Sequence, residues 1–140
     1  MALRKLLLLF LLSLFTALAS AQPAGTPEQL LERCKQAFVR KDIRAYIDLV
    51  ALNREADRAG FEAQFRHAAQ QPLRSAKLLP LSAYQASYDR ALKRGMKPSV
   101  QVEGWIELEF EAAQLPGGVV EKSSVVLLYG RKDGGYFLGS

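Results

Sequence analysis

Hydrophobic and polar positions alternate along residues 100–112. One alternate set is apolar, and the other carries mostly glutamate and glutamine. The apolar set comprises Val100, Val102, Ile106, Leu108, Phe110 and Ala112, and the opposite set comprises Gln101, Glu103, Trp105, Glu107, Glu109 and Glu111. A period of two places alternate side chains on opposite faces of a strand. The pattern therefore predicts a long strand with one dry face, which the preceding segments are expected to cover.

Upstream of this strand, apolar residues recur at helical spacing. Thr26, Pro27 and Gln29 form a helix start, with a capping threonine, a first-turn proline and a glutamine that can complete a capping box. Asp42 is expected to cap a second helix, and Pro72 to end a third. The expected helices span residues 27–40, 43–52, 54–70 and 83–94. Three of them therefore precede the sheet.

Turn residues divide the C-terminal part of the chain into strands. Pro116 is followed by two glycines, and Asp133–Gly134 is a strong signal for a two-residue hairpin. Residues 125–128 are consecutive and apolar, which indicates a strand that is dry on both faces. The expected strands span residues 73–80, 100–113, 119–131 and 135–139. Together these elements predict a single α+β domain with N-terminal helices and a C-terminal β-meander.

Residues 1–21 have the composition of an export signal. A positive start is followed by an apolar run over residues 6–18 and then by small residues. The pattern predicts cleavage between Ala21 and Gln22, a mature domain of residues 22–140, and a periplasmic or secreted protein. The run is shorter than the ~20 residues of a membrane helix, which favours a signal peptide over a membrane span. We expect no transmembrane segment in the mature chain. The alternative is an uncleaved N-terminal anchor.

Removal of this segment lowers the net charge. The whole sequence has 19 basic and 14 acidic residues, and Arg4 and Lys5 lie in the predicted signal. The remaining 17 basic and 14 acidic residues give a net charge of +3. So small a surplus does not indicate a nucleic-acid partner.

Four basic residues gather near the end of the fourth expected helix. They are Arg90, Lys93, Arg94 and Lys97. Positive side chains at the end of a helix complement the negative end of its dipole, and we favour this interpretation. The alternative is contact with anionic head groups or glycans.

Several kinds of chemistry have little support in the composition. One cysteine and one histidine cannot form a structural zinc set, and no metal or cofactor is expected. Cys34 shares helical spacing with Leu30 and Phe38, which predicts a buried thiol, and His67 is expected to face solvent. The glutamates of residues 103–111 are interpreted as a solvated face rather than as a catalytic pair.

Three local patterns resemble the nuclear transport factor 2-like superfamily. They are the helix junction at residues 40–49, the alternating strand that opens at residues 100–105, and the turn with an aromatic close at residues 131–137. The resemblance implies a cone-shaped fold in which N-terminal helices pack into the concave side of a curved antiparallel sheet. Such folds host enzymes, binding modules and dimerisation domains, so the resemblance selects no function.

The resemblance also implies a pocket inside the cone. Its candidate lining is Tyr46, Phe65, Tyr84, Tyr88 and Phe110. Ketosteroid isomerases and related dehydratases of the superfamily use Asp, His or Tyr groups there. No residue of this chain matches a catalytic motif position, so no catalytic residue is assigned, and the tyrosines can equally be core residues.

A second candidate surface lies on the other face of the expected sheet. Trp105 shares this face with part of the doubly dry strand, so Val126 and Leu128 are expected to be exposed beside it. An apolar patch within a polar rim is typical of an interface. The pattern predicts a homodimer or a docked partner there.

These observations favour an exported, non-catalytic binding or protein-interaction module. Its partner would be an unknown protein or a small apolar ligand. One alternative is a small isomerase- or dehydratase-like enzyme with an apolar pocket. Another is a periplasmic inhibitor or immunity protein.

Overall fold

The computed structural model describes residues 22–140, so the predicted signal peptide and its end at Ala21 lie outside the described residues. The helices are α2 (Pro27–Val39), α3 (Ile43–Asp48), α4 (Arg58–Ala68) and α5 (Gln85–Lys93), with the 3₁₀ turns η1 (Glu55–Asp57) and η2 (Leu81–Tyr84). The strands are β1 (Val50–Ala51), β2 (Leu73–Pro80), β3 (Gln101–Phe110), β4 (Ala113–Gln114), β5 (Val120–Glu121), β6 (Ser124–Lys132) and β7 (Gly135–Gly139). The predicted α+β class is confirmed.

The main sheet has five strands in the order β1-β7-β6-β3-β2. Its long strands pair antiparallel, as the meander pattern predicts. The short strand β1 instead runs parallel to β7, which makes the sheet mixed. The expected helix over 43–52 is therefore too long, because the residues after Asp48 pair with the last strand.

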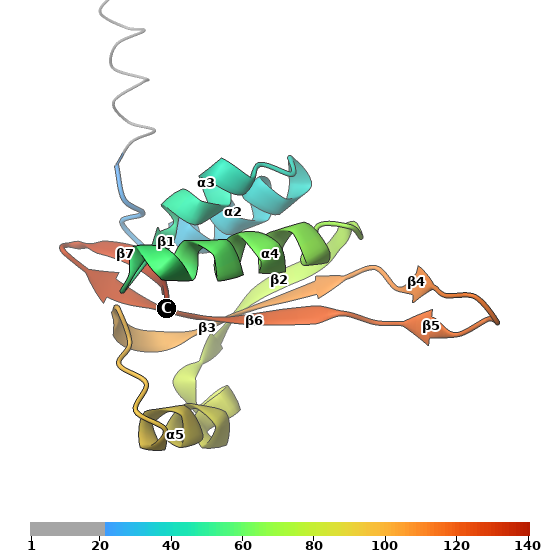
Figure 1. Ribbon diagram of the computed structural model, residues 1–140. Helices are drawn as coiled ribbons and strands as arrows, with labels where there is room; N and C mark the ends of the chain where they lie inside the picture. The colour runs from blue at the N-terminus through green and yellow to red at the C-terminus, as the bar shows by residue number, and fades with distance from the viewer. Residues whose placement is uncertain (1–21) are drawn as a thin grey trace, which may run out of the picture.

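Helices α2, α3 and α4 lie together on one face of this sheet, whereas η2 and α5 lie on the other (Figure 1). The expected helix over 54–70 is divided into η1 and α4, and the one over 83–94 into η2 and α5. Three helices therefore close one face, and a single short helix covers part of the opposite face.

The helix starts follow from local side-chain bonds. Thr26 Oγ1 accepts a hydrogen bond from the Gln29 N–H (3.1 Å), and the Gly25 N–H donates to Gln29 Oε1 (2.8 Å). Asp42 Oδ1 accepts from the Ala45 N–H (3.1 Å). These bonds pair N–H groups that have no partner within the helix, so the predicted caps at Thr26 and Asp42 are confirmed.

The predicted single dry face of residues 100–112 is wrong at its start. The register shifts between Val102, which pairs with Gly130, and Gly104, which pairs with Tyr129. Consecutive strand residues face opposite sides, so Val102 lies on the face away from the three helices. A Cβ atom at Gly130 would lie 2.0 Å from the Gln101 carbonyl oxygen, so glycine permits this close approach of the strands.

Beyond β3 the chain extends into an arm formed by β4 and β5, which projects from the body (Figure 1). The expected strand over 119–131 is therefore divided into β5 and β6. Leu115, Val119 and Val120 on this arm are exposed. The turn predicted around Pro116 lies at the tip, where Gly117 and Gly118 both adopt positive φ angles.

Candidate functional site

The aromatic residues expected to line a cone pocket form a packed cluster between the helices and the sheet. Phe38 lies 5.3 Å from Tyr46, 4.6 Å from Phe65 and 5.4 Å from Phe110, measured between ring centroids. All four rings are buried. Tyr46, Phe65 and Phe110 therefore fill the space that the cone pocket was expected to occupy.

Polar groups within this core are kept neutral by burial. Burial raises the pKa of Tyr46, whose hydroxyl donates a hydrogen bond to Gln64 Oε1 (3.4 Å). Burial also raises the pKa of the Cys34 thiol to about 12, and the side chain is inaccessible to solvent. Cys34 lies in the core, as its helical spacing predicts.

Tyr84 and Tyr88 lie on the opposite face of the sheet from the other pocket candidates. Their rings pack edge-on against Trp105, with centroids 5.7 and 6.3 Å away. The Trp105 indole N–H donates to the Leu81 carbonyl oxygen (3.0 Å). These contacts attach η2 and α5 to the sheet, so the five predicted pocket residues do not line one cavity.

Glu107 departs most from the expected solvated face. The Tyr84 hydroxyl donates a hydrogen bond to its carboxylate, and Lys77 Nζ lies 3.2 Å from Oε1. The side chain is only 12% exposed. The hydrogen bond from Tyr84, together with Lys77, lowers the pKa of Glu107, so the group remains an anion rather than becoming a neutral acid.

Neighbouring glutamates on this strand are also engaged. Glu103 pairs with Arg131 (3.2 Å), and the Ser75 hydroxyl donates to Glu109 (3.3 Å). Side chains of adjacent strands therefore reach across to these carboxylates, while Glu103 and Glu111 remain exposed to solvent.

The predicted interface residues Trp105, Val126 and Leu128 are half-buried. Leu128 pairs with Trp105 across the sheet, and Val126 pairs with Glu107. Because η2 and α5 pack against Trp105, the chain itself buries part of the surface that a second molecule was expected to bury. Less apolar surface is left there than the sequence pattern indicated.

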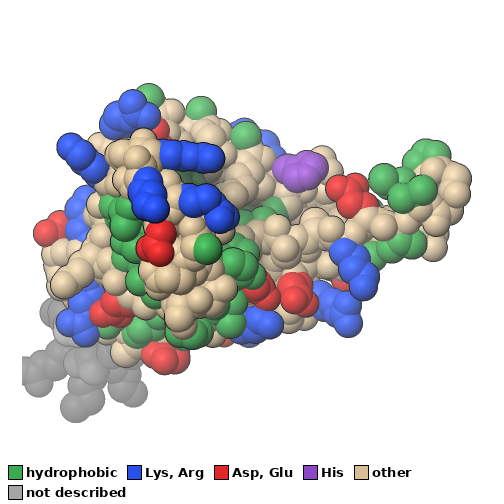
Figure 2. All heavy atoms as spheres, turned by 90° about the horizontal axis from the view of Figure 1, so that it is seen from below, with side chains coloured by type: hydrophobic (Ala, Val, Ile, Leu, Met, Phe, Trp, Pro, Cys, Tyr) green, Lys and Arg blue, Asp and Glu red, His purple; other side chains and the backbone are tan. Residues whose placement is uncertain are grey.

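The four basic residues singled out from the sequence lie on α5 and directly after it: Arg90 and Lys93 on the helix, Arg94 at its C-cap, and Lys97 in the following loop. Arg90, Lys93, Arg94 and Lys97 are all exposed. Helical spacing places Arg90 and Lys93 on the side of α5 away from Tyr88. Figure 2 shows Lys and Arg side chains gathered on the underside, where α5 lies. We call this set the cationic face.

Within residues 22–140, no acidic side chain forms an ion pair with the cationic face. The end of α5 is also closed by its own backbone. The Gly95 N–H donates to the Leu92 carbonyl (3.0 Å), and the Met96 N–H donates to the Ala91 carbonyl (3.0 Å), with Gly95 at φ 91°. This Schellman arrangement satisfies terminal carbonyls without help from a charged side chain.

A hollow of about 610 Å³ opens beside the cationic face. Its lining consists of Ser87, Arg90, Ala91, Arg94, Gly95 and Met96. Arg90 Nη2 donates a hydrogen bond to Ser87 Oγ (3.1 Å), which positions the guanidinium. Arg90 and Arg94 both line this open hollow, so two guanidinium-bearing side chains border one site, a composition suited to an oxyanion.

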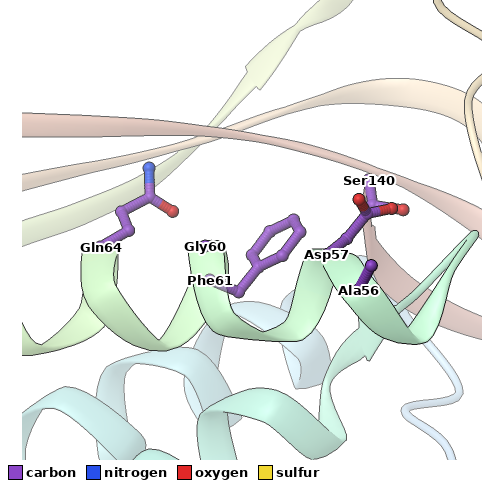
Figure 3. A pocket seen from close by; sticks show the side chains of 6 residues that line it. All are labelled: Ala56, Asp57, Gly60, Phe61, Gln64 and Ser140. Atoms are coloured by element: carbon purple, nitrogen blue, oxygen red, sulfur yellow. The ribbon is translucent and has the colours of Figure 1, made fainter.

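A different hollow, of about 530 Å³, lies between α4 and the end of β7. Figure 3 shows Phe61 and Gln64 of α4 beside it, with Asp57 and Ser140 at one end. This site has an apolar ring but no cluster of titratable groups suited to a reaction.

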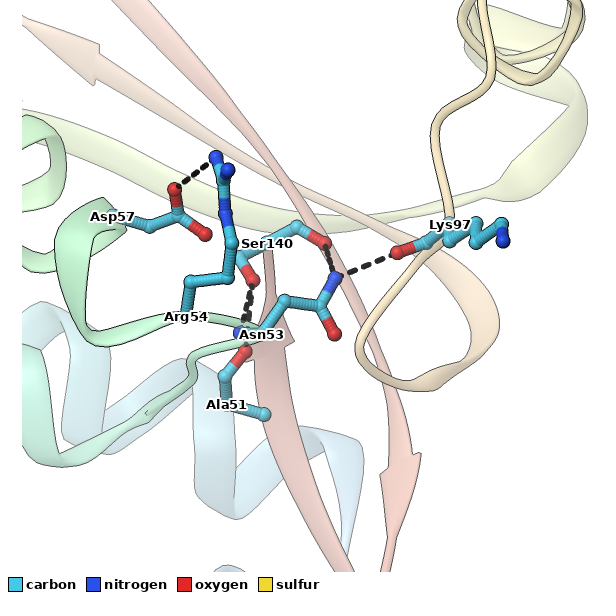
Figure 4. Close-up of polar contacts among 6 residues, drawn as sticks. All are labelled: Ala51, Asn53, Arg54, Asp57, Lys97 and Ser140. Carbon is cyan, nitrogen blue, oxygen red and sulfur yellow. Dashed lines mark hydrogen bonds and ion pairs between the residues drawn. The ribbon is translucent and has the colours of Figure 1, made fainter.

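The polar groups around Ser140 join separate parts of the fold. Asn53 Nδ2 donates to the Lys97 carbonyl (2.6 Å), the Asn53 N–H donates to Ser140 Oγ (2.9 Å), and Ser140 Oγ donates to the Ala51 carbonyl (3.1 Å) (Figure 4). Nearby, Arg54 pairs with Asp57 (3.0 Å). These bonds hold the loop after α5 against the sheet, so their evident role is structural.

No protein-family model, curated protein or solved structure matches this chain. The resemblance to the nuclear transport factor 2-like superfamily therefore stays a prediction. Within residues 22–140, no helix has the length and apolar character needed to cross a membrane. The described residues also contain no group of three or more His, Cys, Asp or Glu side chains placed to hold a metal ion.

Proposed function

We propose that this protein is an exported, non-catalytic binding module that recognises a multiply charged anionic partner through the cationic face of α5. The observation that carries the proposal is the position of the charge. Residues 81–98 contain four basic residues and one acid, Asp89, whereas the rest of residues 22–140 contains 13 of each sign. The whole net charge of +3 therefore belongs to the short segment that includes α5.

The absence of ion-pair partners supports a binding role. Asp89 adjoins Arg90 in the sequence, but the four cations form no ion pair within residues 22–140, so they retain attraction for an external anion. Because the backbone already closes the end of α5, four cations exceed what the helix end requires. This argument favours the anion-binding interpretation over the helix-dipole interpretation.

The enzymatic alternative has weaker support. An isomerase-like site needs an ionisable pair in a deep apolar cavity. Tyr84 and Glu107 do form a pair, but they serve to attach η2 to the sheet, and neither lines the hollow beside α4 or the hollow beside α5. A lowered pKa also makes Glu107 a weak general base.

Heparin, a polyanion of defined charge, provides the test. Replacement of Arg90 and Arg94 by Gln should reduce the slope of log binding constant against log salt by about two, because two fewer counterions are released. The matched control is Arg40→Gln with Arg44→Gln. It removes the same charge from exposed residues at the α2–α3 junction, in the helix layer on the opposite face.

The control should retain most of the wild-type affinity. Equal losses of heparin affinity in the two double variants would contradict the proposal, because binding would then depend on the net charge of the protein and not on the position of the charges at α5. Far-UV circular dichroism of each variant verifies that the fold is intact.

A further inference from the structure

We infer that a hollow at the base of the β4–β5 arm binds a small zwitterion of the size and charge of a free amino acid. The hollow has a volume of about 290 Å³ and lies where the arm leaves the main sheet (Figure 1). This volume is close to the lower end of ligand pockets, about 300 Å³, so it suits a small molecule. The hollow is separate from the cationic face of α5, so the site adds to the proposed function and does not depend on it.

Three segments that are distant in the sequence bring charges of both signs to this hollow. Arg74 of β2 and Lys122, between β5 and β6, supply two cations, and Glu109 of β3 supplies a carboxylate. Figure 2 shows basic and acidic side chains close together at the base of the arm. Within residues 22–140, neither cation forms an ion pair with Glu109 or with any other acid. Because these opposite charges border one hollow without pairing, a ligand that carries both signs can contact all of them.

A β-bulge positions one of the cations. The register of β2 and β3 shifts between Leu73, which pairs with Phe110, and Ser75, which pairs with Glu109. Arg74 is the extra residue of this bulge, and a bulge redirects a side chain out of the regular alternation of a strand.

The second cation is placed by the backbone of the neighbouring segment. The Phe110 N–H donates a hydrogen bond to the Ser123 carbonyl oxygen (3.1 Å), and this bond holds the segment that carries Lys122 beside β3. The backbone therefore fixes the positions from which both cationic side chains extend.

The lining offers a separate contact for each part of the ligand. Ser75 Oγ donates to Glu109 Oε2 (3.3 Å), which leaves Oε1 to accept from an ammonium group. Arg74 and Lys122 would receive the carboxylate, since a guanidinium offers a carboxylate two parallel N–H donors. Phe110 and Ala112 form an apolar part of the lining, against which the side chain of the ligand would lie.

The mixture of charges also selects against simpler ions. A plain carboxylate would be attracted to the two cations but repelled by Glu109, and a plain amine would be attracted to Glu109 but repelled by both cations. The zwitterion is therefore the class of ligand that the site favours.

An NMR titration of the isotope-labelled protein with L-leucine tests this inference. Saturable shifts are expected in the amides of Arg74, Glu109 and residues 122–124, and not in those of α5. Isocaproate is leucine without the ammonium group, and isoamylamine is leucine without the carboxylate. Each should bind about fivefold more weakly than leucine, because each loses a charged contact. Equal binding of leucine and isocaproate would overturn the zwitterion assignment, and a lack of saturable shifts at these residues would overturn the site.

Two variants that each remove one charge separate the two ends of the ligand. Glu109→Gln should weaken leucine binding about fivefold and leave isocaproate binding no weaker than in the wild type, because only leucine has an ammonium group. Lys122→Gln should weaken the binding of both compounds. Glu111→Gln and Lys132→Gln are the matched controls, since both residues are exposed and neither lines the hollow.

The controls should bind leucine as the wild type does. Equal losses in Glu109→Gln and Glu111→Gln, or in Lys122→Gln and Lys132→Gln, would overturn the inference, because binding would then depend on net charge alone. The amide spectrum of each variant verifies that the fold is intact.

Discussion

On one face of the main sheet three helices bury four aromatic rings against one another, whereas on the other face a single short helix leans on Trp105. The first cluster includes Phe38, Phe65 and Phe110, all buried. The second consists of Trp105, Tyr84 and Tyr88, all half-buried, and Tyr84 donates a hydrogen bond to the charged Glu107. The same strands therefore support a dry core on one side and a polar attachment on the other.

The two faces therefore have different roles, since one mainly stabilises the fold and the other positions the proposed binding helix. The helix-covered face contributes most of the buried apolar area, which is the main favourable term in folding. The opposite face buries less and positions a cationic helix. We therefore expect changes in the first region to unfold the protein, and changes in the second to release or alter α5 while the rest stays folded.

The largest effect is expected from Phe38→Ala. Phe38 contacts three other rings, and loss of a buried aromatic side chain costs about 3–5 kcal/mol of unfolding free energy. Urea unfolding measures this loss, and faster labelling of the Cys34 thiol reports the opened core. The adjacent Val39→Ala is the matched control, since Val39 is 65% exposed. Equal effects of the two substitutions would contradict the description of this core.

A smaller and local effect is expected from Trp105→Ala. The ring is half-buried, so the cost should be about half of the roughly 3–5 kcal/mol of a fully buried aromatic residue. Hydrogen exchange should accelerate in residues 81–97 and remain slow in α2, because only α5 loses its support.

Trp105→Phe is the comparison variant, since it keeps an aromatic ring and removes the hydrogen bond to Leu81. Its stability and its hydrogen-exchange rates in residues 81–97 should lie between those of the wild type and of the alanine variant. A uniform rise in exchange across the domain would show instead that the two faces unfold as one unit.

The smallest effect is expected from Tyr84→Phe, which removes the hydroxyl donor to Glu107. The folded-state pKa of Glu107 lies below its ordinary value of 4.5. Its charge therefore stabilises the fold above the unfolded pKa, and this contribution is lost as the pH falls through the folded pKa. The stability difference between the wild type and the variant should be constant near pH 7 and should narrow below pH 4.5.

Thermal unfolding at several pH values measures this difference. Tyr88→Phe is the control, because its ring also packs against Trp105 while the hydroxyl that binds Glu107 belongs to Tyr84. A gap between Tyr84→Phe and the wild type that stays constant through the acid range would contradict the assigned role of Glu107.

Much of the local structure could be predicted from short stretches of sequence. The caps at Thr26 and Asp42 and the turn at Asp133–Gly134 are confirmed, the last with φ angles of 49° and 78°. Such features depend on hydrogen bonds and backbone angles within a few residues. The basic group from Arg90 to Lys97 can also be identified from the sequence. Its lack of ion pairs cannot, because folding decides which acidic side chains lie near it.

The candidate site was less predictable. Tyr84 and Tyr88 were grouped with Tyr46, although they lie on opposite faces of the sheet. Nothing within the helix at residues 85–93 specifies which face it will cover. The doubly dry strand at residues 125–128 was the one signal that the second face also needed a cover.

The sequence by itself determined the α+β class, the helix caps, the hairpin turn and the presence of a basic helix, because each is encoded in local spacing and side-chain type. Only the tertiary structure decided that Glu107 is held by Tyr84 and Lys77 and that α5 covers Trp105 with its cations outward. These outcomes depend on contacts between residues that are distant in the sequence, such as Tyr84 and Glu107, which are 23 positions apart. Such contacts follow from the path of the whole chain around the sheet.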